Sequence, residues 1–322
     1  MKQQEDLQTH LNEFLPQMDE ALTKADMPVS ERPMVAARFF VDNLVLEISG
    51  GTKENYLLQP WFASIFRPIQ DWYKKRYGEA RVHPRRALTG AVKHHGALYK
   101  TRVPTTVARP QGDGTCWLTF AKDILPGEDP ATWVVNGPPL DQMKPKQADA
   151  FRASAAATAV SLRSIANDLM TADLEVGPAR NGAKSVLKHL DKAASDMCEV
   201  DEESLTLAVW ELQLANEKVI KTYLTQEGIA YPKTHDLRDL NKLAPAKHDW
   251  SAIAAGLTGF PSERRVMAWR YQEKAAPTVS DLWRYYGVTL QICSVYAARM
   301  GRTYALKNAA FLLKRPPWLG VD

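Results

Sequence analysis

Residues 207–240 read LAVWELQLANEKVIKTYLTQEGIAYPKTHDLRDL, and this stretch decides the fold of the C-terminal half of the chain. Glu217 and Lys221 are four residues apart, in the order that stabilises a helix. After a short turn, Thr234 is the expected N-cap of a second helix, with Asp236 in its first turn. The first helix is amphipathic, because its apolar residues recur at helical spacing: Leu205, Ala208, Leu212, Ala215 and Val219.

The regions around this stretch predict an α+β fold that is mostly α. Short β-favouring runs separated by Gly and Pro predict a small sheet of three to five strands: residues 97–101, 105–108, 116–120 and 133–135, with the turn QGDGT at 111–115. Helical periodicity predicts helices up to about residue 49, then over residues 60–77 with an interruption at Pro68, 147–170, 183–197, 203–226, 235–243 and 278–312. We therefore expect four parts: an N-terminal helical segment (1–55), a basic domain with a small β-sheet (56–146), a connecting helix (147–177) and a helical bundle (178–322).

The composition of the 322 residues is that of an ordinary globular protein, with 45% hydrophobic and 24% charged residues. No run approaches 18 apolar residues, and the polar N-terminus lacks the features of a secretory signal or a transit peptide, so we expect a cytoplasmic protein without a membrane partner. The three distant cysteines, Cys116, Cys198 and Cys293, suit a reducing compartment. The sequence contains no P-loop, GxGxxG, GxSxG or HExxH motif, and we predict neither a cofactor nor a metal.

Positive charge is concentrated between residues 60 and 110. This segment has eleven cations and two carboxylates, a net charge of +9, whereas the rest of the chain carries −5. Aromatic residues alternate with the cations, a combination that suits single-stranded nucleic acid because cations neutralise phosphates and rings stack on bases. The alternative is that the aromatic residues form a core and the cations a solvated face. The predicted nucleic-acid-binding residues are Lys74, Lys75, Arg81, Arg85, Arg86 and Lys93.

The same segment contains a candidate catalytic pair, Arg76 and His83. Their separation of seven residues is about two helical turns, although Gly78 and Pro84 argue against one continuous helix. A histidine can act as a general acid or base near neutral pH, and an arginine can stabilise charge on phosphate. The pair could therefore cleave RNA without a metal, with the 2′-hydroxyl as nucleophile.

The motifs ANEKVIKTYL (215–224) and PKTHDL (232–237), separated by a short Gly/Pro turn, resemble the HEPN family of helical bundles. The resemblance covers roughly residues 178–305 and implies a HEPN-like bundle. Many members are metal-independent ribonucleases that carry Arg, four to six residues and then His, and act as dimers. Other members bind nucleotides or partner a small nucleotidyltransferase. Residues 178–322 lack the Arg-x4–6-His motif, and the chain matches it only at Arg76 and His83, outside this region.

A second candidate site lies in the HEPN-like region. His235 and Asp236 are expected at a helix N-terminus, where free N–H groups and the helix dipole favour anions. A phosphate-bearing ligand would suit this position together with the nearby cations Lys218, Lys221, Lys233 and Arg270. The alternative is that His235 bonds a neighbouring helix and Asp236 caps its own helix, while the lysines face water.

The function we expect is nucleic-acid or nucleotide binding within a prokaryotic defence or toxin-type system. One alternative is a metal-independent endoribonuclease. Another is a non-catalytic scaffold that recruits a nuclease or nucleotidyltransferase. The expected partners are RNA or a nucleotide, a second copy of the chain in a homodimer, as the resemblance implies, and a nucleotidyltransferase or another defence-system protein.

Overall fold

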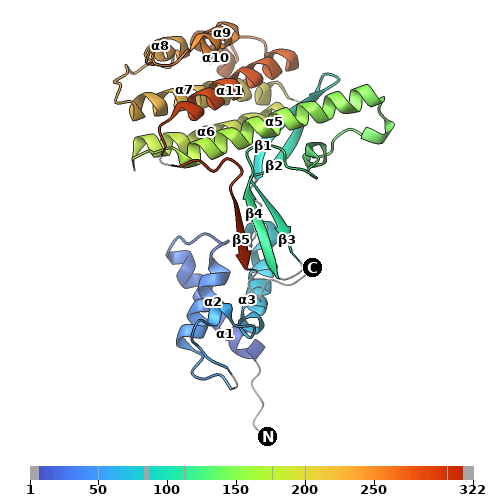
Figure 1. Cartoon of the computed structure of the whole chain (residues 1–322), viewed down its shortest axis with the longest axis vertical. Helices are drawn as coiled ribbons and strands as arrows, with labels where there is room; N and C mark the ends of the chain where they lie inside the picture. Colours follow the sequence, from blue (N-terminus) through green and yellow to red (C-terminus); the bar gives the residue numbers. More distant parts are fainter. Residues whose placement is uncertain are drawn as a thin grey trace. The chain divides into compact units, whose positions relative to one another are not determined.

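The computed structural model describes residues 7–49, 51–82, 87–111, 114–175, 177–199, 201–302 and 304–314. The fold is α+β and mostly α, as predicted. The chain forms two compact units, and the predicted segment 56–146 is divided between them. The four-part division therefore stays a prediction. The first unit comprises Met1–Arg86, Arg109–Trp117 and Leu312–Asp322; the second comprises Ala87–Ala108 and Leu118–Phe311 (Figure 1).

The first unit is built around a small helical core. Its described helices are α1 (Leu7–Lys24), α2 (Arg32–Asn43), the 3-10 turn η1 (Tyr56–Leu58), α3 (Phe62–Tyr77) and α4 (Glu79–Val82). Contrary to expectation, Pro68 lies inside α3 without interrupting it. The missing N–H costs one helical hydrogen bond, but the face of α3 that carries Ile65, Ile69 and Tyr73 is buried and holds the helix in place.

Aromatic residues of the basic segment supply much of this core. Phe62 and Tyr73 are fully buried and Phe66 nearly so, while Trp61 and Trp72 pack against them at the edge. These rings therefore stabilise the unit by removing apolar surface from water. The buried rings are not available for stacking on bases.

The second unit is a helical bundle centred on α7. Its helices are α5 (Pro145–Thr171), α6 (Pro178–Met197), α7 (Glu202–Gln226), α8 (Leu237–Lys242), α9 (Ser251–Gly259), α10 (Glu263–Arg270) and α11 (Val279–Arg299), with the 3-10 turns η2 (Pro130–Trp133) and η3 (Leu140–Gln142) before them. Helix α7 contacts α6, α8, α10 and α11 (Figure 1). Four residues of its predicted stripe, Ala208, Leu212, Ala215 and Val219, have no exposed surface, and the first, Leu205, is half-buried.

Two expectations for the bundle were wrong, and two of its helices were not predicted individually. The predicted helix over 278–312 ends at Arg299 in the structure, and the sequence patterns did not reveal α9 and α10. The N-cap of α8 is Asp236 rather than Thr234, since the Asp236 carboxylate accepts hydrogen bonds from two backbone N–H groups of the first turn. Thr234 instead accepts a bond from the N–H of Asp236.

A β-hairpin packs on the bundle in the second unit. Strands β1 (Ala87–His94) and β2 (Ala97–Pro104) pair antiparallel, and β1 contacts α5 and α6. Gly90 permits this contact, because a Cβ there would lie 2.7 Å from Leu162 and 2.9 Å from Thr158 of α5. The hairpin is therefore part of the bundle core.

A separate three-stranded sheet has the order β3 (Thr106–Pro110), β4 (Thr115–Phe120) and β5 (Ala310–Lys314). Residues 112 and 113 of the predicted turn at 111–115 lie outside the described residues, and on either side of them the N–H of Gln111 donates to the carbonyl of Thr115 at 2.8 Å. The predicted strand at 133–135 was wrong, because Val134 forms only an isolated bridge to Thr101 after η2. Strand β5 lies where the last helix was expected to continue.

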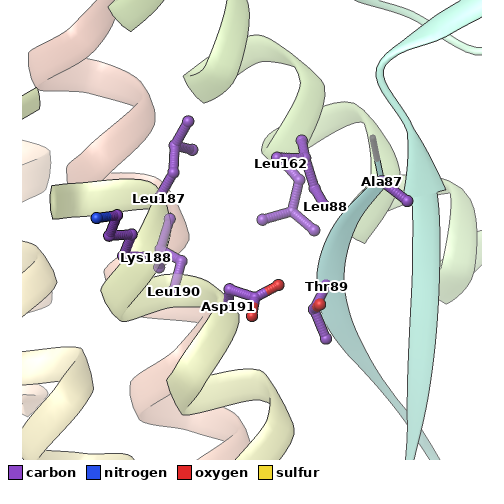
Figure 2. A pocket seen from close by; sticks show the side chains of 8 residues that line it. All are labelled: Ala87, Leu88, Thr89, Leu162, Leu187, Lys188, Leu190 and Asp191. Carbon is purple, nitrogen blue, oxygen red and sulfur yellow. The ribbon is translucent and has the colours of Figure 1, made fainter. Parts of the chain in front are cut away.

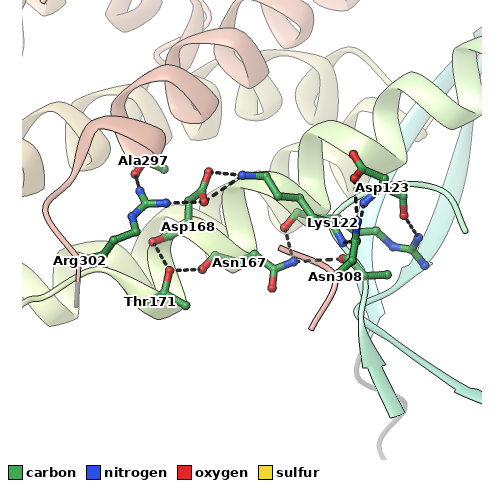
Figure 3. Close-up of polar contacts among 10 residues, drawn as sticks. Lys122, Asp123, Asn167, Asp168, Thr171, Ala297, Arg302 and Asn308 are labelled. Carbon is green, nitrogen blue, oxygen red and sulfur yellow. Dashed lines mark hydrogen bonds and ion pairs between the residues drawn. The ribbon is translucent and has the colours of Figure 1, made fainter. Parts of the chain in front are cut away.

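A polar network within the second unit fastens two loops to α5 (Figure 3). The buried carboxylate of Asp168 accepts bonds from Lys122 at 3.1 Å and Arg302 at 2.7 Å. Asn308 accepts from the backbone of Lys122 and donates to the Asp123 carboxylate at 2.8 Å. One buried carboxylate thereby joins the segment after β4 to the segment after α11. In the described ranges, no helix is both long and apolar enough to cross a membrane.

Candidate functional site

The centre of the candidate site is the buried carboxylate of Glu217 on α7, which is only 4% exposed. It accepts a hydrogen bond from Lys221 Nζ at 2.7 Å, one turn further along the helix. Its other oxygen lies 2.8 Å from His235 Nδ1. The pair Glu217–Lys221 is therefore present as its spacing predicted, with the histidine as a third member.

His235 is fixed by the backbone as well as by its ring. Its carbonyl accepts a bond from Gln213 Nε2 at 2.7 Å, one turn before Glu217 on α7. The following residue, Asp236, caps α8 by accepting from the N–H groups of Arg238 at 2.8 Å and Asp239 at 3.1 Å. Both contacts of the alternative interpretation, a helix bond for His235 and a cap for Asp236, are thus present.

The Glu217 carboxyl is held in its charged form. Burial alone would raise its pKa, but the hydrogen bonds and charges of Lys221 and His235 outweigh burial and lower the pKa below its usual value. The His235 side chain is 58% exposed although Nδ1 is bound. Among the described residues, Nε2 has no hydrogen-bond partner, so this edge of the ring is presented to solvent.

The other predicted cations of this site lie along the outer side of α7. Lys221 contacts the ring of Tyr231 as well as Glu217, and Lys233 is exposed two residues before His235. Arg270 stacks over Trp210 at 4.4 Å, seven residues before Glu217 and about 10 Å away along the axis of α7. Lys218 is half-buried on the neighbouring row of α7. The structure thus brings Lys221 and His235 together at Glu217 and places Arg270 about two turns away along α7.

The predicted basic segment is divided between the two units. Lys75 and Arg81 are exposed in the first unit, where Lys74 pairs with Glu79 at 3.3 Å. Lys93 belongs to β1 in the second unit and bonds Ser280 at 3.0 Å. Arg85, Arg86 and His83 lie outside the described residues. One run of charge in sequence therefore does not form one surface of a single unit.

Arg76, the other member of the predicted catalytic pair, contacts a buried carboxylate. Its guanidinium lies 3.1 Å from Asp19, which is 3% exposed and also bonds Arg32. It also stacks over the rings of Trp72 and Tyr77. These contacts join α3 to α1, which gives Arg76 a structural role, and its side chain remains 53% exposed.

Sequence reasoning missed a second group of polar residues, on α6. His189 Nδ1 lies 2.6 Å from Glu211 of α7, and both side chains are largely buried. Helix α6 also carries a cation at every fourth position, a pattern that is visible in the sequence. Because residues four apart lie on the same face of a helix, these cations share the solvent side of α6: Arg180, Lys184, Lys188 and Lys192. In the part of the chain that the structure describes, no group of three or more His, Cys, Asp or Glu residues could hold a metal.

Comparison with known families identifies this region. A HEPN domain model matches residues 188–257, from the middle of α6 into α9, and the match includes Glu217, Lys221 and His235. Comparisons with curated proteins and with solved structures gave no match. The C-terminal half of this chain carries a HEPN domain.

Proposed function

We propose that the HEPN domain binds RNA or a nucleotide through the outer face of α7 and the start of α8, within a prokaryotic defence or toxin-type system. The main observation that supports this proposal is that a buried, ionised Glu217 holds Lys221 and an exposed His235 side by side. A buried carboxylate needs paired cations or donors to be tolerated, and here the partners of Glu217 extend to the surface.

The groups around His235 suit a phosphate-bearing ligand. Lys221 shares the Glu217 carboxylate with the ring, Lys233 is an exposed cation two residues before His235, and Arg270 offers a guanidinium two turns away. Cations neutralise phosphates, and imidazole and guanidinium groups hydrogen-bond their oxygens. The exposed Nε2 of His235 accepts a hydrogen bond in the neutral ring and donates one in the protonated ring, so it can contact either a hydroxyl or a phosphate.

The proposal is tested by fluorescence anisotropy with labelled single-stranded RNA and tRNA, at low and physiological salt. The wild type should bind, with affinity that falls as salt rises. His235→Gln and Arg270→Gln should each weaken binding about fivefold or more. The matched control is Lys242→Gln, because Lys242 is an exposed cation of the same region that already pairs with Asp239 at 2.8 Å.

Three outcomes separate this proposal from the alternatives. Equal affinity for the control, His235→Gln and wild type would refute the site. Absence of binding to RNA and to free nucleotides would leave the scaffold that recruits a nuclease or nucleotidyltransferase. RNA cleavage in EDTA that disappears in His83→Ala, but persists in His235→Gln, would instead support the endoribonuclease with Arg76 and His83 as its pair. Light scattering on the same samples tests the homodimer.

A further inference from the structure

We propose that α6 carries the backbone of a single-stranded polynucleotide, and that the pocket beside α6 receives one of its unstacked bases. This inference rests on the proposed function for its ligand class, and it extends that function to a different surface of the same unit. It also selects between the two ligands above, because a row of cations that can neutralise several phosphates favours a polymer over a free nucleotide.

The cations of α6 form a regular row. Arg180, Lys184, Lys188 and Lys192 recur every four residues, with a rise of about 6 Å per step. All four are exposed. Lys192 pairs with Asp196, but in the described ranges no ion pair neutralises the other three. The step exceeds the about 3.4 Å per nucleotide of a stacked duplex strand, so the row suits an extended, unstacked strand.

A pocket of about 290 Å³ opens beside this row, between β1, α5 and α6 (Figure 2). Leu88, Leu162, Leu187 and Leu190 make most of its wall apolar. Its volume lies just below the range of small-molecule sites, which is about 300–1,000 Å³. The pocket can therefore hold a planar base but not a whole nucleotide with its phosphates.

Lys188 connects the pocket to the row, because it belongs to both. In Figure 2 the side chain of Lys188 points away from the pocket, while Asp191 faces Thr89 across the opening. Within the described part of the chain, Asp191 has neither an ion pair nor a hydrogen bond. A strand whose phosphates follow α6 would thus place a base against apolar walls, with a carboxylate at the base edge.

The free carboxylate of Asp191 predicts which base is preferred. A carboxylate accepts hydrogen bonds and donates none when ionised. Guanine offers two adjacent N–H donors on its Watson–Crick edge, whereas uracil offers one donor between two acceptors. We therefore expect a guanine in the pocket. A bidentate contact of this kind discriminates by about fivefold or more.

The polymer is tested with labelled 12-nucleotide oligouridylates, with and without one central guanosine, and with the matching deoxyoligonucleotides to distinguish RNA from DNA. Lys184→Gln/Lys188→Gln should reduce the slope of log affinity against log salt by about 1.4, because each cation that neutralises a phosphate of a single strand adds about 0.7 to it. The control, Lys242→Gln/Lys247→Gln, removes two exposed cations that pair with Asp239 and Glu227 and should leave the slope unchanged. Unlabelled guanosine monophosphate should compete poorly.

The pocket is tested with Asp191→Asn and Leu187→Trp in the same assay. Asp191→Asn should abolish the preference for the guanosine oligonucleotide and keep the salt slope, while Leu187→Trp, which fills the pocket, should remove the preference as well. Loss of affinity in His235→Gln with no effect of the α6 variants would refute this inference and keep the proposed function. Absence of any binding would refute both, and full competition by the mononucleotide would refute the polymer.

Discussion

Asp19 in the first unit and Glu217 in the HEPN domain are both buried carboxylates with two basic partners. The partners differ in their exposure and in their other contacts. Asp19 bonds Arg32, which is itself 9% exposed, and Arg76, which stacks on two aromatic rings. Glu217 bonds Lys221 at 18% exposure and His235 at 58%. Each carboxylate therefore has one covered and one exposed partner, since Arg76 is 53% exposed. The two exposed partners differ in their contacts, because Arg76 stacks on two aromatic rings whereas the outer edge of the His235 ring faces solvent.

This difference bears directly on function. A cation that is bonded to a buried anion and stacked on two rings has little freedom to move toward a ligand, because moving it would leave the anion uncompensated. His235 needs no such movement, since its outer edge is already exposed. The comparison thus favours the HEPN domain over the Arg76 region as the ligand site.

The largest expected effect is that of Asp19→Asn on the stability of the first unit. The substitution leaves the buried Arg32 guanidinium without a counter-charge, which should cost about 3–5 kcal/mol. Denaturant unfolding of the full chain, followed by tryptophan fluorescence, measures this loss. The neighbouring Glu20→Gln is the control, because Glu20 pairs with Lys24 on the surface and its removal should leave the midpoint unchanged. Equal midpoints for both variants would contradict the structural role of Asp19.

Cysteines show what burial does to an ionisable group when neighbouring charges do not outweigh it. Burial raises the pKa of the Cys198 thiol to about 11, and it also raises the pKa of Cys293. At pH 8 the thiolate fraction of Cys198 should be about 100-fold lower than that of a thiol of ordinary pKa, since each unit of pKa changes it tenfold. Reaction with a disulfide reagent should therefore be correspondingly slow for Cys198 in the native protein and fast after unfolding. A rapid native reaction of Cys198, assigned by peptide mapping, would contradict this.

Glu217→Gln should have a smaller effect than Asp19→Asn, about 1–3 kcal/mol, because Lys221 and His235 remain partly hydrated when the charge is lost. The effect also depends on pH. The folded-state pKa of Glu217 is lowered, so its stabilising contribution is complete above its ordinary pKa near 4.5 and is lost as pH falls through the folded-state value. The difference between wild type and variant in denaturant unfolding should thus shrink below about pH 4. A difference that is constant from pH 7 to pH 3 would refute the ionised carboxylate.

The sequence predicted those features that depend on neighbours along the chain. The Glu217–Lys221 pair and the buried stripe of α7 follow from helical periodicity, and both are present. The bond from His235 to Glu217 spans a turn and could be proposed only as an alternative, because spacing does not fix how α8 approaches α7. Strand β5 was missed because its pairing partner β4 lies almost 200 residues earlier in the chain.

For the basic segment, the sequence predicted a single surface that the structure divides between two units. Its charge and aromatic content indicated one binding surface, but composition cannot distinguish rings that form a core from rings that face solvent. The structure buries Phe62, Phe66 and Tyr73 and assigns Lys93 to the other unit. The cations of α6 were visible in the sequence as a four-residue repeat, yet only the structure shows that, in the described ranges, Arg180, Lys184 and Lys188 form no ion pair while Lys192 pairs with Asp196.

The smallest expected effect on stability, that of His235→Gln, gives the sharpest test of the comparison. The exposed ring makes one partly solvated contact with the Glu217 carboxylate, and exposed contacts of this kind contribute about 0.2–1 kcal/mol. Unfolding should therefore change little, while RNA affinity falls. Arg76→Gln should behave in the reverse way, lowering the unfolding midpoint because the guanidinium no longer bonds Asp19 or stacks on Trp72 and Tyr77, with RNA affinity unchanged. Unfolding and RNA affinity, measured for both variants on the same preparations, distinguish a residue that contacts a ligand from a residue that stabilises the packing of two helices. If Arg76→Gln were the variant that lost RNA, the ligand site would lie in the first unit.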